Sequence, residues 1–194
     1  YRDKVWTVDG FSGAPPQLRV SSEKGLSATE LLSGYFTWDQ MFYGFIPGSI
    51  GETSTIAILI GATILLITGI GSWRVMLATM TGMVLTTYIL NNLASVIGST
   101  NPMLYIPPAY HFVMGGFAFG MVFMATDPVS CAQTNLGRWL YGFLIGFMCV
   151  IIRAVNPAYP EGMMLAILFA NAFSPLFDYF VMQANIKRRE RRHV

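Results

Sequence analysis

Charged residues are scarce in this chain. Asp, Glu, Lys and Arg together make up 11% of its 194 residues, whereas a soluble domain has about a quarter. Hydrophobic residues make up 54%, and the mean hydropathy is +0.52. The few charges stand at the ends of apolar segments and in the first 52 residues, because an ion inside hydrocarbon is costly. The composition predicts an integral membrane protein, and we expect no nucleic-acid partner.

Cysteine and histidine are equally rare. Cys131 and Cys149 have neither the number nor the spacing of a disulfide framework or a zinc site, which favours two packing cysteines. His111 and His193 are far apart and fall on opposite sides of the expected bundle, so they predict no metal centre. The chain opens with polar YRDKVW, has no secretory signal and does not begin with Met. We therefore expect it to be the later part of a longer chain.

Five stretches are long and apolar enough to span a bilayer, which takes about 20 residues. They cover 54–70, 74–93, 108–125, 136–152 and 163–183. Pro108 stands at the tolerated start of its helix, whereas Pro175 should kink or break the last helix near Ser174. The sequence thus predicts an all-α polytopic membrane helix bundle. Residues 1–53 form an extracytoplasmic region, 54–183 the five spans and 184–194 a basic tail.

Charge sets the expected orientation. Five basic residues follow the last span directly, and such residues stay in the cytoplasm; they are Lys187, Arg188, Arg189, Arg191 and Arg192. An odd number of spans then places residues 1–53 outside. Arg153, on the expected outer side, is a single opposing charge. Within the outer region, residues 26–43 alternate polar and apolar at helical spacing, which predicts a short helix on the membrane surface.

Small residues recur inside two of the spans. Gly115, Gly116 and Gly120 lie in the third, and Gly142 and Gly146 lie in the fourth. Such residues let helix backbones approach closely, so we interpret them as packing positions.

Four acidic residues near the spans are candidates for function. Asp178 lies inside the fifth span, after Pro175, which frees backbone carbonyls; together these oxygens suit a small cation or a proton relay. The alternative is an ion pair with Lys187 or Arg188. Structural roles also remain open for the other three acids. Asp127 precedes a proline and can end a helix in a turn, and Glu52 and Glu161 can complement a helix dipole.

Three segments resemble a known family: NPAYPEGMMLAILFANAFSPLFDYFVMQANIKRR, FMATDPVS and PGSIGETST. They are similar to the B-type membrane subunit of the bacterial sodium-translocating NADH:quinone oxidoreductases, and less closely to the homologous D-type subunit of the Rnf complex. The resemblance covers essentially the whole chain and implies the second half of a ten-span subunit of the inner membrane. It implies electron transfer from NADH through other subunits and flavins to ubiquinone, coupled to sodium transport, with riboflavin also held in the complex.

The resemblance also implies a covalent flavin. In that family an extracytoplasmic S-G-A-T motif carries FMN, which a flavin transferase joins through its phosphate to the threonine hydroxyl. The matching positions here are Asp9, Gly10, Ser12, Gly13 and Ala14, and Pro15 stands where the family has threonine. Either the acceptor is lost, or a flavinylated threonine, which is not a standard residue, is missing from the printed sequence after Ala14. We favour the second interpretation because the rest of the motif is kept.

The resemblance makes Asp178, Asp127 and Glu52 our candidate contacts along a sodium path. Two other functions stay open. One is an Rnf-type ferredoxin:NAD oxidoreductase subunit, and the other is a transporter or channel without electron transfer.

Overall fold

The computed structural model describes residues 36–46, 48–49, 51–99, 101–156 and 161–191. These residues form helices and connecting turns, with no strand among them. Three helices are long and apolar enough to cross a membrane: α7 (Trp73–Ile97), α10 (Asn135–Val155) and α11 (Met163–Glu190). A shorter apolar helix, α6 (Thr55–Ile67), precedes them. The predicted helical membrane bundle is confirmed.

Polar caps mark where the helices begin and end. Ser54 and Thr134 start α6 and α10, and their hydroxyls accept hydrogen bonds from Ala57 N (3.4 Å) and Gly137 N (3.0 Å). Thr37 and Gln40 form a reciprocal capping box on α5 (Trp38–Tyr43). Gly98 ends α7 at φ +66°, a conformation that costs glycine little. Only the last turns of the helix expected over 26–43 lie in the described residues.

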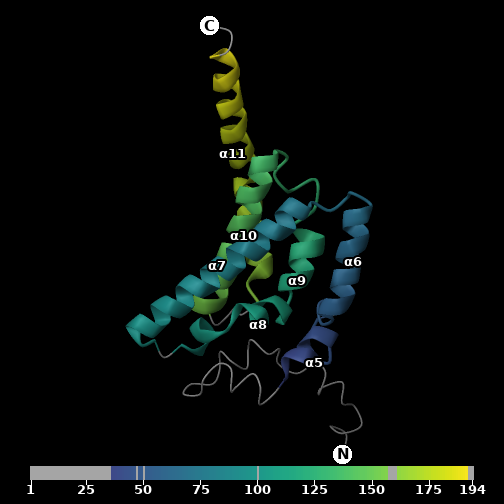
Figure 1. Ribbon diagram of the computed structural model, residues 1–194, viewed down its shortest axis with the longest axis vertical. Coiled ribbons are helices and arrows are strands. Elements are labelled where there is room, and N and C mark those ends of the chain that lie inside the picture. Colours follow the sequence, from purple (N-terminus) through teal and green to yellow (C-terminus); the bar gives the residue numbers. More distant parts are fainter. Residues whose placement is uncertain (1–35, 47, 50, 100, 157–160, 192–194) are drawn as a thin grey trace, which may run out of the picture.

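Successive helices run between two ends of the molecule (Figure 1). The short helices α5 and α8 (Pro108–Val113) lie at one end, and the tip of α11 lies at the other. A small apolar cluster packs with α5 and α8 and is formed by Met41, Ile46, Met103, Ile106, Val113 and Met114. We call this the α5 end, and we call the opposite one the tail end.

Helices α7 and α10 approach closely through glycine. A methyl group at Gly142 would lie 2.6 Å from the carbonyl oxygen of Val75. One at Gly146 would clash with the carbonyl of Thr79, and one at Gly82 with that of Phe143. The packing role predicted for Gly142 and Gly146 is confirmed, and Gly82 supplies the matching small residue on α7.

The third predicted span is not one helix. Helix α8 ends at Val113, and the chain resumes as a helical turn, α9 (Phe117–Phe119), followed by a π-helical turn over Gly120–Met124. Gly115 between them has φ +60°, which side chains with a Cβ rarely adopt. The expectation of a continuous helix over 108–125 is therefore wrong. Gly115, which the sequence pattern suggests is a packing residue, is instead the position at which the chain turns.

Pro175 does not break the fifth span. Helix α11 is helical from Met163 through Pro175 to Glu190. Within membranes, neighbouring groups can satisfy the carbonyls that a proline frees, so a proline is tolerated inside a long span.

Candidate functional site

A cavity lies beside Asp178. It has a volume of about 570 Å³ and opens between the chain before α10 and the middle of α11. Asp178, Asn171 and Ser174 line it from α11, and Ser130 and Gln133 line it from the loop. These side chains carry oxygen atoms, which are the ligands that hard cations prefer. We call this space the inner cavity.

Asp178 joins α11 to the start of α10. Its carboxylate accepts hydrogen bonds from Gln133 N at 2.7 Å, Thr134 N at 2.9 Å and Thr134 Oγ1 at 2.6 Å. Thr134 is the residue that caps α10. The expected alternative, an ion pair with Lys187 or Arg188, is not formed in the described part of the chain. Asp178 therefore has a structural role beside the cavity, because it joins α11 to the residue that caps α10.

Asp127 closes a turn at the same end. It accepts hydrogen bonds from Ser130 Oγ (2.7 Å), Ser130 N (3.1 Å) and Val129 N (3.4 Å), which together lower the pKa of its carboxyl. The turn interpretation is confirmed. Burial raises the pKa of the neighbouring Cys131 thiol, and the charges of Asp127 and Asp178 both act in the same direction. Cys131 and Asp178 line the same cavity, and Asp127 lies in the turn beside it.

Glu52 lies apart from them, at the break in the third span. Its Oε1 accepts a hydrogen bond from Ser49 N at 3.0 Å. Its Oε2 lies 2.9 Å from the point that a Cβ of Gly116 would occupy, so this carboxylate packs directly against the broken segment. Burial raises the pKa of Glu161, and the nearby charge of Glu52 raises it further. Two acids therefore share the α5 end of the bundle.

Arg153 organises this region, and the sequence reasoning missed it. Its side chain is 1% exposed. Nη1 donates to His111 O and Nη2 to Met114 O, both at 2.9 Å, and Nε donates to Glu161 O at 2.8 Å. These carbonyls belong to the end of α8, the break that follows it and the segment before α11. Arg153 thus satisfies backbone oxygens that a broken helix leaves without partners.

A signal for Arg153 was present in the sequence. It is an arginine at the end of an apolar segment, and an ionisable residue within a membrane segment is by default a candidate for function. By its position in the sequence it counts only as a single charge against the expected orientation. The broken segment that it serves could not be seen in the pattern of apolar residues.

Two expected features stay open. The proposed flavin segment, with Asp9, Gly10, Ser12, Gly13 and Ala14, lies outside the described residues. In the part of the chain that the structure describes, no three His, Cys, Asp or Glu side chains come together as a metal site.

Comparison with known proteins identifies the chain's relatives. The model of the NQR2, RnfD, RnfE family matches residues 2–187. The chain is 56% identical over 192 residues to the B-type subunit of the Na(+)-translocating NADH-quinone reductase of Yersinia pestis, covering 98% of this chain and 46% of the relative. The subunit of the same name from Klebsiella pneumoniae (strain 342) is 58% identical over 193 residues, with the same coverage.

A third relative, from Haemophilus influenzae, has the same name and is 56% identical over 194 residues. The chain spans about half the length of these curated relatives. The family match covers nearly all of the chain, including the loop around Asp127, the helix with Pro175 and the loop with Glu52. The chain therefore belongs to the NQR2, RnfD, RnfE family.

Proposed function

We propose that this chain is part of a membrane subunit of a sodium-translocating NADH:ubiquinone reductase. The observation that carries the proposal is the 56–58% identity, over 98% of the chain, to relatives that bear the name of that enzyme. The other subunits of the complex, ubiquinone and membrane lipid are its partners. We place it in the bacterial inner membrane with the tail end in the cytoplasm, because the basic residues gather there.

We further propose that the segment containing Asp9, Gly10, Ser12, Gly13 and Ala14 carries covalent FMN, attached by a flavin transferase. Bound FMN supplies electron transfer. The printed segment offers no threonine after Ala14, so the proposal requires a flavinylated threonine between Ala14 and Pro15. Riboflavin and ubiquinone belong to the whole complex.

The described residues support a path for sodium that has two separate parts. At the tail end, Asp178 offers a carboxylate at the rim of the inner cavity, with Asp127 close by in the loop. At the α5 end, Glu52 offers a carboxylate against the break in the third span. Broken helices are a common feature of ion sites in membrane proteins. Arg153 holds that break in place.

The absorbance of the denatured polypeptide tests the flavin proposal. Phosphoester-linked FMN survives denaturation, so absorbance at ~450 nm should migrate with the chain, as expected of a flavin cofactor. Mass analysis of the peptide containing Gly13 and Arg19 should give the mass of the printed residues plus one threonine and FMN. A peptide that reads Ala-Pro with no added mass would remove the redox role of this chain and leave a transporter or channel.

The sodium proposal needs a pair of variants. Asp178→Asn removes the charge and weakens the capping contacts, whereas Thr134→Val removes one capping hydroxyl and leaves the carboxylate. We expect Asp178→Asn alone to weaken the sodium dependence of quinone reduction by the assembled complex. Both variants should lower its thermal stability. Equal sodium activation in both variants would show that Asp178 acts only as a cap.

A further inference from the structure

A second cavity lies at the tail end, on another face of α11. It has a volume of about 650 Å³ and is bounded by the start of α10 and the last turns of α11. Its lower wall is apolar and is formed by Leu136, Val181 and Ala184. Its basic wall is formed by the long side chains of Lys187, Arg188 and Arg191, and Asn185 completes the lining. The cavity therefore changes along α11 from hydrocarbon-like to cationic.

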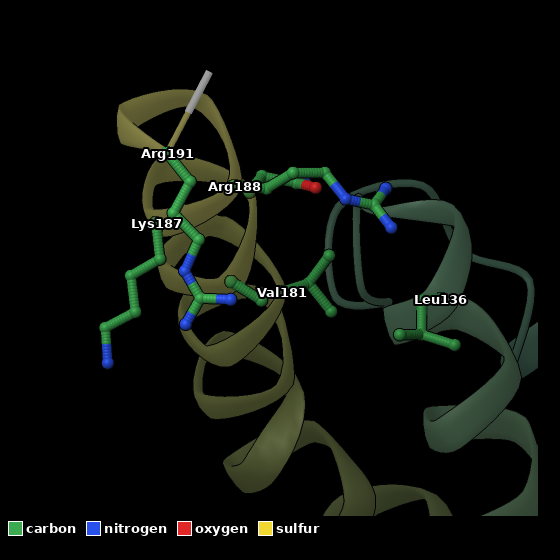
Figure 2. A pocket seen from close by; sticks show the side chains of 7 residues that line it. Leu136, Val181, Lys187, Arg188 and Arg191 are labelled. Carbon is green, nitrogen blue, oxygen red and sulfur yellow. The ribbon is translucent and has the colours of Figure 1, made fainter. Parts of the chain in front are cut away.

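The helix repeat produces this arrangement. Val181, Ala184, Arg188 and Arg191 follow one another at intervals of three or four residues, so they lie along one face of α11. Figure 2 shows Arg188 reaching from α11 toward the chain at α10, above the space between Val181 and Leu136. Arg189 does not line the cavity. One basic face is thus distinguished from the rest of the tail.

Aromatic residues place the cavity at the membrane boundary. Trp139 lies one turn beyond Leu136 on α10 and contacts Trp73 of α7 edge to face, with ring centroids 6.1 Å apart. Arg74 lies over the Trp73 ring at 4.9 Å. Tryptophan and basic side chains collect where hydrocarbon meets the headgroups. The apolar wall therefore lies at the level of acyl chains and the basic wall at the level of lipid phosphates.

The basic groups are not neutralised within the described chain. Lys187, Arg188 and Arg191 are exposed, and none forms an ion pair with any residue that the structure describes. Cations at the end of a helix complement its dipole. An interaction with the helix dipole, however, would not require these basic residues to line a cavity or to share a face of α11 with apolar residues. The combination matches a ligand with negative phosphate above and hydrocarbon below.

We propose that this cavity binds the headgroup of an anionic phospholipid. Arg188, which reaches over the space beside α10 (Figure 2), contacts the phosphate, with arginine suited to bidentate contact. Lys187 and Arg191 add positive charge at the edge of the cavity, and Leu136, Val181 and Ala184 contact the first part of an acyl chain. The inference needs only the membrane location of the bundle and does not depend on electron transfer or sodium transport. Basic pockets between membrane helices are a recognised setting for anionic lipid.

The test uses the whole purified complex, depleted of lipid in neutral detergent. Cardiolipin is titrated against phosphatidylcholine with the same acyl chains, and bound lipid is counted by native mass spectrometry. A basic residue that contacts the anionic headgroup is worth about a fivefold change in affinity. We expect Arg188→Gln to weaken cardiolipin retention about fivefold, and the triple variant Lys187→Gln, Arg188→Gln, Arg191→Gln to abolish it.

Arg189→Gln is the matched control, because it removes the same charge from the same turn outside the cavity. It should retain cardiolipin within about twofold, as a rim charge alone contributes little. Arg188→Lys, which keeps the charge, should retain an intermediate amount. All variants lie on an exposed surface, and assembly is checked by size-exclusion chromatography.

Four outcomes would overturn the proposal. If Arg189→Gln lost as much cardiolipin as Arg188→Gln, the lipid would be held only by the general positive charge of the tail. Equal retention of phosphatidylcholine would mean an apolar groove without headgroup recognition. Displacement of the lipid by inorganic phosphate would make free phosphate the ligand. A crosslink from the tail to another subunit in the wild-type complex, with no lipid bound, would mean that protein covers this face.

Discussion

At the residue scale, the α5 end depends on one buried cation. Arg153 donates to carbonyl oxygens of three separate segments, at His111, Met114 and Glu161. A buried polar group that loses its partner costs about 1–3 kcal/mol. The break in the third span is stable because these oxygens have a donor.

Replacing this arginine should therefore destabilise the subunit strongly. We expect Arg153→Met to lower the free energy of unfolding by at least about 3 kcal/mol, since several buried carbonyls lose their donor together. Thermal melting of the purified complex would measure it. Arg138→Met is the control, because Arg138 donates to one carbonyl, Ala132 O at 3.1 Å, and is only partly buried. Equal losses in the two variants would contradict this role.

The acids near Arg153 predict a pH effect. Burial and the charge of Glu52 raise the pKa of Glu161 above its usual 4.5. The ionised form is thus disfavoured in the folded protein, and its cost is present at neutral pH and disappears as pH falls through the raised pKa toward 4.5. Glu161→Gln should raise the melting temperature at neutral pH, by an amount that shrinks on acidification.

The carbonyl of Glu161 that binds Arg153 is untouched by this change, so the arginine contacts remain. Asp127→Asn is a suitable contrast, because hydrogen bonds lower the pKa of that carboxyl and the effect on stability has the opposite sign. A constant stabilisation by Glu161→Gln at all pH values would argue against titration of this group.

At the element scale, the α7 and α10 pair rests on backbone contact. Gly82, Gly142 and Gly146 leave no room for a methyl group between the two helices. In a membrane the hydrophobic effect does not hold helices together as it does in a soluble bundle, so close van der Waals contact of this kind stabilises the pair.

Gly146→Ala should push α10 away from Thr79. Overpacking of a close contact costs about 1–3 kcal/mol, and we expect a loss in that range, measured by thermal melting in detergent. Leu140→Ala, on the same helix, changes a side chain that is 44% exposed and should cost less. A larger loss for Leu140→Ala would mean that α10 is held mainly by its outward face.

At the scale of the whole molecule, helices that run back and forth leave the loops at two ends (Figure 1). The loop before α10 lies at the tail end, and the end of α10 lies at the α5 end. The basic tail predicts that the tail end faces the cytoplasm.

Two valines test this orientation. Val129, 88% exposed, lies in the loop before α10, and Val155, 74% exposed, lies at the end of α10. In cells whose outer membrane has been permeabilised, a membrane-impermeant thiol reagent should label Val155→Cys and not Val129→Cys. The native Cys131 and Cys149 are buried and give little background. Labelling of Val129→Cys alone would invert the bundle.

Much of this architecture could be predicted from single residues. Low charge and long apolar stretches predict α7, α10 and α11, because backbone that faces lipid has no water and forms its hydrogen bonds within a helix. The pair Gly142 and Gly146 predicts close packing, and Asp127 before Pro128 predicts a turn. Each of these inferences depends only on residues close together in the sequence, because a span, a close glycine contact and a turn are all set by local chemistry.

The order of residues along the chain is enough to establish the membrane class, the helical state and the family, since composition, periodicity and motif are all local properties. Folding in three dimensions was needed to locate the break in the third span, and to show that Asp178 caps α10 rather than pairing with the tail. Arg153 is far in sequence from His111 and Met114, as Asp178 is from Thr134. Contacts of that kind follow from how helices pack, which no local pattern encodes.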